Sequence, residues 1–141
     1  MITEQYVTFE TAKTANGKGF NENTDSYYLT VDGATRLHHI WDKNCSVKFP
    51  ANNEKLTEIT ELSGYNNYIS APTQSLLAGW LREIRNVNVT VRFRKDICKY
   101  FYEVENIQIS EDGFVSGKKQ FSRYEHAMEE GLRCALNFLA W

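Results

Sequence analysis

Residues 76–94 read LLAGWLREIRNVNVTVRFR, and within this stretch the spacing of the apolar residues changes from helical to strand-like. The first half repeats apolar side chains every three or four residues, which predicts a helix with one broad buried stripe. That stripe consists of Leu76, Leu77, Trp80, Leu81 and Ile84. From Val87 onward apolar and polar residues alternate, which predicts a strand with one buried face.

A partner strand is predicted after a short polar turn. Tyr100, Tyr102 and Val104 continue the alternation, and the strand is expected to end near Ile107 or Ile109. Two strands joined by so short a turn run antiparallel, so they form a ribbon on which the neighbouring helices are expected to pack.

The last helix is predicted from its start and from its apolar stripe. Ser122 is followed three residues later by Glu125, which predicts a capping box in which each side chain bonds the other's free backbone N–H. Cys134 lies beside the stripe and is expected to be a small core residue, whereas Glu129 and Glu130 are expected to face water. The stripe consists of Tyr124, Met128, Leu132, Ala135, Leu136 and Leu139.

The N-terminal half predicts a short helix and a hairpin. Thr8 is a suitable N-cap, and the helix that it opens is expected to end at the glycine-containing residues 16–19. Asp32-Gly33 separates two apolar runs, residues 27–31 and 37–41. The preference of this dipeptide for positive φ angles predicts a tight turn between two antiparallel strands.

Residues 45–64 carry conflicting signals. Apolar residues recur every three positions as in a short helix, whereas the threonines and asparagines around them favour a strand or loop, so no element is assigned. The central helix that follows has a clearer start. Pro72 is tolerated only in a first helical turn, and either Ser70 or Thr73 can serve as its N-cap.

Together these elements predict an α+β fold with a mainly antiparallel sheet and with helices packed on one face. The C-terminal part is expected to follow the order helix, strand, strand, an optional third strand, and helix. We expect a single domain over residues 1–141. The alternative is an N-terminal sub-lobe of residues 1–69 beside a C-terminal core of residues 70–141.

The composition excludes several classes of protein. The chain has 141 residues and a formal net charge of −2, which argues against a surface devoted entirely to nucleic acid. Cys45, Cys98 and Cys134 are an odd number of cysteines at unrelated separations, which favours reduced thiols and a cytoplasmic location. The sequence shows neither a signal peptide nor an apolar run of membrane-spanning length, so no membrane association is expected.

No motif in the sequence predicts catalysis or metal binding. His38 and His39 are neighbours on a predicted strand, so their side chains point to opposite faces and do not chelate one metal. The glutamate pairs at 103/105 and 129/130 have the pattern of solvated faces. Residues 16–19 contain Gly-x-Gly without a preceding strand, so no phosphate loop is predicted. We therefore expect no enzymatic activity, no catalytic residue, and no bound cofactor or metal.

Basic residues are concentrated around the predicted ribbon. Arg92 and Arg94 fall on its open face, and Lys118 with Lys119 precede the last helix. This order of helix, antiparallel strands, lysine pair and helix resembles the layout of a double-stranded-RNA-binding domain, which recognises the shape and the phosphates of RNA. The resemblance implies nucleic-acid binding through a basic patch as the alternative function. The candidate residues are Arg82, Arg85, Arg92, Arg94, Lys118 and Lys119.

Five short strings, spread over the start, the middle and the end of the chain, carry a resemblance to other proteins. They are YVTFETAK at 6–13, KGF at 18–20, APTQSLL at 71–77, WLRE at 80–83, and YE-x-A followed by EEGL within 124–132. These strings resemble a family of small uncharacterised proteins from phages and prophages of gut anaerobic bacteria. The resemblance implies an accessory protein of a phage or mobile element, and it transfers no catalytic residue. We expect such a protein to act through contact with another macromolecule, with a protein as the first choice of partner and with the oligomeric state open.

Overall fold

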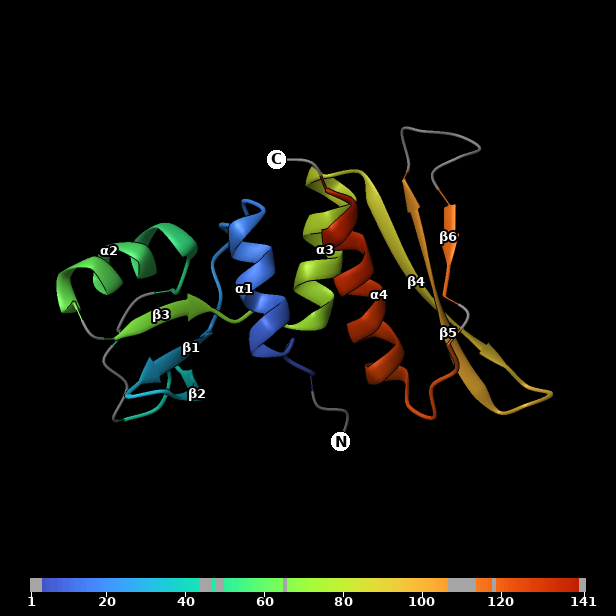
Figure 1. The fold of residues 1–141 in the computed structure, drawn as a ribbon, viewed down its shortest axis with the longest axis horizontal. Coiled ribbons are helices and arrows are strands. Elements are labelled where there is room, and N and C mark those ends of the chain that lie inside the picture. Colours follow the sequence, from blue (N-terminus) through green and yellow to red (C-terminus); the bar gives the residue numbers. More distant parts are fainter. Residues whose placement is uncertain are drawn as a thin grey trace. The chain divides into compact units, whose positions relative to one another are not determined.

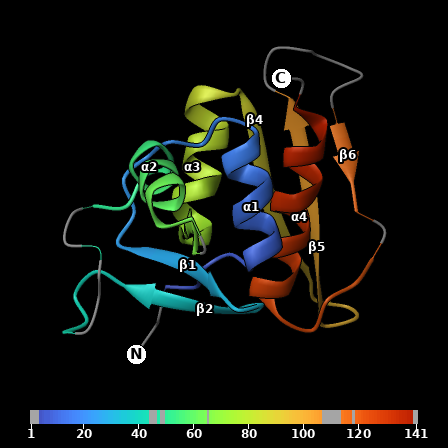
Figure 2. The same ribbon diagram turned by 60° about the vertical axis from the view of Figure 1, so that its left-hand side comes forward.

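The structure, a computed structural model, describes residues 4–43, 47, 50–64, 66–106, 114–117 and 119–139. Helices and antiparallel sheets make up an α+β fold, which confirms the predicted class (Figures 1 and 2). The chain divides into two compact units. The N-terminal unit is Tyr6–Thr73, and the C-terminal unit is Gln74–Trp141 together with the residues before Tyr6. The border after Thr73 lies later than the predicted sub-lobe border at residue 69, and the prediction of a single domain stays a prediction.

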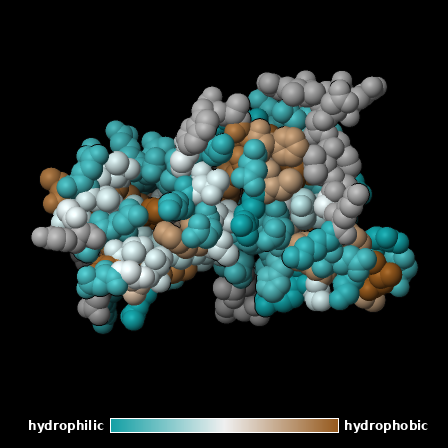
Figure 3. All heavy atoms as spheres, viewed as in Figure 1, coloured by the Kyte–Doolittle hydropathy of each residue, from teal (hydrophilic) through white to brown (hydrophobic). Residues whose placement is uncertain are grey.

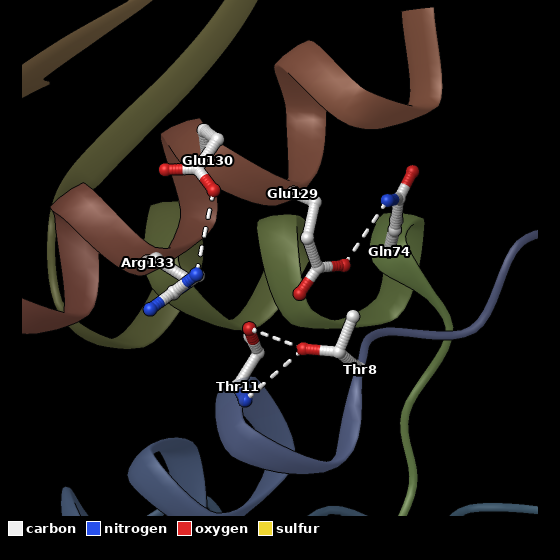
Figure 4. Close-up of polar contacts among 6 residues, drawn as sticks. All are labelled: Thr8, Thr11, Gln74, Glu129, Glu130 and Arg133. Atoms are coloured by element: carbon white, nitrogen blue, oxygen red, sulfur yellow. Dashed lines mark hydrogen bonds and ion pairs between the residues drawn. The ribbon is translucent and has the colours of Figure 1, made fainter.

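The first helix of the N-terminal unit, α1 (Phe9–Gly17), begins as predicted. Thr8 is its extended N-cap, and the Thr8 Oγ1 atom accepts a hydrogen bond from the Thr11 backbone N–H at 3.4 Å (Figure 4). After the helix ends, the backbone N–H of Phe20 donates to the carbonyl oxygen of Ala15 at 3.0 Å, and the Phe20 side chain is fully buried. The chain therefore folds back onto the helix that it has just left.

The N-terminal sheet contains β1 (Ser26–Val31), β2 (Ala34–His39) and β3 (Asn67–Ser70) in the antiparallel order β2-β1-β3. The predicted hairpin turn is confirmed, because Asp32 and Gly33 adopt φ angles of 50° and 82°. Two consecutive positive φ angles give a turn whose twist matches that of the strands which it joins.

The stretch with conflicting signals forms a helix, α2 (Asn53–Ser63). Asn52 caps its start by accepting a hydrogen bond from the Lys55 backbone N–H at 2.9 Å, and Gly64 ends it with a φ of 72°. The asparagine that favoured a loop therefore serves as the helix cap. Leu56 alone of this helix is fully covered, in a core with Tyr27, Val47 and Ala51.

The C-terminal unit follows the predicted order. It contains α3 (Gln74–Ile84), β4 (Val87–Arg94), β5 (Lys99–Asn106), β6 (Phe114–Ser116) and α4 (Tyr124–Phe138). The three strands pair antiparallel in the order β4-β5-β6, and both helices pack on one face of this sheet (Figure 1). Val87, Val89 and Val104 are buried on that face, as the alternation predicted. The predicted strand end at Ile107 or Ile109 lies outside the described residues.

Ser70 as a cap of α3 and the predicted capping box of α4 are both wrong. Ser70 ends β3, and its hydroxyl donates to Asn16 Oδ1. The helix α3 begins at Gln74, directly after the alternative cap Thr73, which stays a prediction. The predicted capping box does not form either, because Lys99 Nζ donates to Ser122 Oγ at 2.8 Å and α4 begins after Arg123 without a side-chain cap. In both cases a partner distant in the sequence binds the hydroxyl that local spacing assigned to the helix start.

The apolar stripes are narrower than their periodicity predicts. On α3, Leu77, Trp80 and Leu81 are buried, whereas Leu76 in the first turn and Ile84 at the last residue are exposed. Glu129 of α4, which was predicted to face water, is instead buried. Its Oε1 atom accepts a hydrogen bond from Gln74 Nε2 at 3.3 Å (Figure 4). Coverage of α3 is therefore confined to its middle, and the buried amide of Gln74 satisfies the carboxylate of Glu129 that the sequence assigned to solvent.

Candidate functional site

The end of the β4–β5 hairpin carries a group of uncovered aromatic and apolar side chains, which we define as the hairpin-end surface: Phe93, Ile97, Tyr100 and Tyr124. Phe93, Ile97 and Tyr124 are 51%, 37% and 45% exposed. The ring of Tyr100 joins two of them, because its centroid lies 4.9 Å from that of Phe93 and 6.1 Å from that of Tyr124. Figure 3 shows hydrophobic atoms among hydrophilic ones at this end of the hairpin.

Exposure at this surface follows from the way in which the helices cover the sheet. Phe93 lies on the same face of β4 as Val89, as predicted, yet Val89 is buried and Phe93 is not. The helix layer covers the beginning of β4 and leaves the hairpin end uncovered. Tyr124, which the sequence placed on a buried stripe, is the first residue of α4 and is also exposed. The sequence signal that could have indicated this surface is the pair Phe93 and Tyr100, which lie on either side of the charged turn 94–99.

The turn beside these rings is positively charged. Residues 94–99 carry three basic side chains and one acidic one, so their formal charge is 3 − 1 = +2. Arg94 Nη2 forms an ion pair with Asp96 Oδ2 at 2.8 Å. Lys95 is exposed and makes no ion pair with any described residue. A partner that covers this surface would therefore gain from acidic groups around an apolar contact.

Three of the six candidate basic residues are ion-paired within the chain. The Nε atoms of Arg82 and Arg92 lie 3.0 Å and 2.6 Å from carboxylate oxygens of Glu83 and Glu103, respectively, and Arg94 is paired as described above. Arg92 and Arg94 share the open face of the sheet, as predicted, whereas Arg82 belongs to α3 on the helix-covered side. The structure thus brings two of these arginines together and separates the third from them.

The remaining candidate basic residues lie over aromatic rings or outside the described chain. The Arg85 guanidinium lies 5.7 Å from the ring centroid of Trp80, and Lys119 Nζ lies 5.4 Å from that of Phe121. Both cations therefore have a favourable contact with an aromatic ring in the C-terminal unit. Lys118 lies outside the described residues.

A second feature of the C-terminal unit is a pocket of about 420 Å³ between one face of α4 and Tyr102 of β5. Its lining residues are Tyr102, Glu130, Arg133, Cys134, Asn137 and Phe138. Glu130 and Arg133 form an ion pair of 3.3 Å across its wall (Figure 4). Cys134 is half-buried beside this pocket, so the prediction that it is a core residue is wrong.

Tyr102 and Cys134 form a hydrogen-bonded pair with shifted acidities. Burial raises the pKa of Tyr102 above 10.0, and the neighbouring Cys134 raises it further. Burial likewise raises the pKa of Cys134 above 9.0, while the hydrogen bond to Tyr102 lowers it and the Glu130 carboxylate raises it. The thiol is therefore mostly protonated at neutral pH, and a protonated thiol is a weak nucleophile.

We expect iodoacetamide at pH 8 to alkylate Cys134 more slowly than the exposed Cys98, by about an order of magnitude, because Cys134 is half-buried and its thiolate is disfavoured. Peptide mass spectrometry over a time course follows each thiol separately. The rate at Cys134 should rise as the pH passes its raised pKa, and unfolding in urea should bring the two rates together. Equal rates in the folded chain would contradict the shift.

The histidines of the N-terminal unit make separate contacts. His38 stacks on Tyr27 with ring centroids 5.5 Å apart, and His39 stacks on Trp41 at 4.3 Å. His39 Nδ1 also makes a short hydrogen bond with Ser26 Oγ. Because the single hydroxyl proton of Ser26 is donated to Asp25 at 3.0 Å, the imidazole N–H must donate to the serine. This order is the reverse of the one that activates a serine nucleophile.

Comparisons with protein-family models, with curated proteins and with solved structures gave no match to this chain. Within the described ranges, no group of three or more histidine, cysteine or carboxylate side chains is arranged to hold a metal ion. The helices of the described part of the chain also lack the combination of length and apolar content that a membrane span requires. The surfaces of the C-terminal unit therefore carry the remaining indications of function.

Proposed function

We propose that this chain is a non-enzymatic accessory protein of a phage or mobile element, and that its hairpin-end surface binds a protein. The observation that carries the proposal is the exposure of Phe93 and Tyr124 beside Arg94 and Lys95. Aromatic and arginine side chains are enriched in the parts of protein interfaces that supply most of the binding free energy. A single exposed aromatic residue is common on protein surfaces, whereas a group joined by ring contacts marks a candidate contact site.

The second candidate function is nucleic-acid binding, which the order α3-β4-β5-β6-α4 supports through its resemblance to a double-stranded-RNA-binding domain. The ion pairs of Arg82, Arg92 and Arg94 favour the protein partner over this alternative. A phosphate that engaged these guanidinium groups would have to compete with carboxylates already within 3.0 Å of them. A protein surface that covers the aromatic rings requires no such exchange.

The test uses the full chain to select binders from a displayed library of random peptides. We expect the selected peptides to combine an aromatic or aliphatic anchor with acidic residues. Replacing Phe93 and Tyr124 together by alanine should weaken the binding of a selected peptide by about 2 kcal/mol, or roughly thirtyfold, because both rings contribute contact area. Fluorescence anisotropy with a labelled peptide measures the change.

The matched control is Leu62→Ala, which removes an exposed apolar side chain from the N-terminal unit and should leave the affinity unchanged. Circular dichroism verifies that the variants remain folded. Peptides that bind the double variant as tightly as the original chain would contradict the proposed surface. A complex with an RNA or DNA duplex that weakens steeply with salt, formed without selection of any peptide, would replace the proposal by its alternative.

A further inference from the structure

The strand β4 lies at an edge of the C-terminal sheet. The sheet order is β4-β5-β6, so β4 pairs with β5 on one side only, and no other described residue pairs with its second side. An edge strand presents unpaired N–H and C=O groups, which natural proteins usually protect by charged side chains, by proline, by a bulge or by a covering segment. The eight residues of β4, VNVTVRFR, contain no proline and pair with β5 in continuous register.

The register identifies the backbone groups that face outward. On β5, Tyr100 exchanges both of its backbone hydrogen bonds with Phe121, and the carbonyl oxygen of Tyr102 accepts from Gly117, so these residues bond on the side away from β4. Alternate residues of an antiparallel strand bond in opposite directions. The intervening β5 residues therefore bond β4, at Asn88, Thr90, Arg92 and Arg94. The outward groups of β4 are consequently those of Val87, Val89, Val91 and Phe93.

We propose that this edge pairs with β4 of a second copy of the chain, antiparallel and with the two-fold axis at Val91. The pairing would join two three-stranded sheets into one of six strands and would use the outward N–H and C=O groups of both copies. A two-fold interface uses the same surface on both copies, so each contact forms twice. A strand that is complementary to itself is therefore sufficient to build it. The proposal depends on the backbone of β4 and goes beyond the protein partner proposed above, with which it shares the side chain of Phe93.

The side chains of β4 are complementary to themselves in this register. On the helix side, Val89 would lie opposite Phe93 of the second copy, which gives the half-exposed Phe93 ring an apolar neighbour. On the open face, Thr90 would lie opposite Arg92, and Asn88 opposite Arg94, of the second copy. No charged side chain is then directly opposite a like charge.

Arg92 is the charged residue nearest to the two-fold axis, and its charge opposes the pairing. The two Arg92 side chains would be diagonal neighbours across the seam. Each is neutralised in its own chain by Glu103, whose Oε2 atom lies 2.6 Å from Arg92 Nε and whose side chain is largely covered. The repulsion between the two arginines is reduced accordingly, and salt reduces it further.

Sedimentation velocity of the full chain over a range of concentrations tests the association. We expect a monomer–dimer equilibrium that Val91→Pro abolishes. The N–H of Val91 faces outward, so proline at that position removes a hydrogen bond across the seam and none to β5. Thr90→Lys should weaken the dimer about tenfold, because each copy then places a lysine opposite Arg92 of the other copy. Within its own chain the new lysine lies opposite Glu103, so the fold should tolerate it. Gln120→Lys adds the same charge at an exposed position away from β4 and should leave the equilibrium unchanged.

Amide hydrogen exchange tests the register. As the concentration rises, the amides of Val89, Val91 and Phe93 should become protected, whereas those of Thr90 and Arg92 should be protected throughout. A chain that stays monomeric up to about 0.5 mM overturns the proposal. A dimer that persists in both Val91→Pro and Thr90→Lys, or one whose protection appears elsewhere, also overturns it.

Discussion

Replacing Leu56 by alanine is expected to lower the free energy of unfolding of the N-terminal unit by about 3 kcal/mol. Leu56 is 1% exposed and packs in a core with Tyr27, Val47 and Ala51. Removing its branched end leaves a cavity among three residues that come from different segments, so the surrounding structure collapses only partly around the loss. In a unit of this size such a change is a large share of the total stability.

The matched control is Leu62→Ala, which makes the same substitution in the same helix at a position that is 88% exposed. It should change the free energy of unfolding by no more than about 0.5 kcal/mol. Urea unfolding followed by circular dichroism, with amide exchange of β1 and β3 as a probe of the N-terminal unit, measures both variants. If the two substitutions were equally costly, the assignment of Leu56 as the only covered leucine of α2 would be wrong.

The second large effect is expected at Gly131 in α4. A Cβ atom placed there would lie 2.8 Å from Val89 Cγ1 and 3.0 Å from Tyr102 Cβ, which is closer than ordinary contact. Gly131→Ala therefore has to push the helix away from the sheet, and we expect it to lower the free energy of unfolding by about 1–2 kcal/mol. The cost of crowding exceeds the gain in helix propensity, which is about 1 kcal/mol.

Gly79 of α3 gives the opposite expectation for the same substitution. A Cβ at Gly79 would meet only Arg82 Nη2, at an ordinary 3.7 Å. Gly79→Ala should therefore raise the free energy of unfolding by about 0.5–1 kcal/mol, because alanine loses less backbone entropy in a helix. The two variants are compared by urea unfolding of the full chain. Stabilisation by both would show that α4 does not approach the sheet at Gly131 as closely as the structure indicates.

The parts of the fold that were predicted correctly depend on local chemistry. The alternation from Val87 to Arg94 defined a strand and its buried face, and Asp32-Gly33 defined a hairpin turn. Thr8 capped α1 as expected. In each case the relevant contacts lie within a few residues, so the sequence contains both partners of the interaction.

The candidate site was harder to predict, because exposure depends on what covers a residue. Phe93 and Val89 follow the same alternation, and the sequence contains nothing to show that the helices cover only one of them. The capping box failed for a related reason, since Lys99 competes for the hydroxyl of Ser122 across 23 positions of sequence. The basic set was recognisable, but the particular carboxylate that pairs with each of Arg92 and Arg94 depends on the register of β4 with β5 and on the turn.

The sequence by itself determined the order of helices and strands in the C-terminal unit, the direction in which β4 and β5 turn their apolar sides, and the tight turn at Asp32-Gly33. These properties follow from backbone sterics and from side-chain periodicity, which act between neighbours in the chain. Only the tertiary structure decided that Leu56 is covered and Leu62 is not, that Gly131 has no room for a methyl group while Gly79 does, and that β4 is an edge strand among the described residues. Each of these outcomes depends on how closely segments far apart in the sequence approach one another, and the balance between burial and solvation at those contacts is absent from any local pattern.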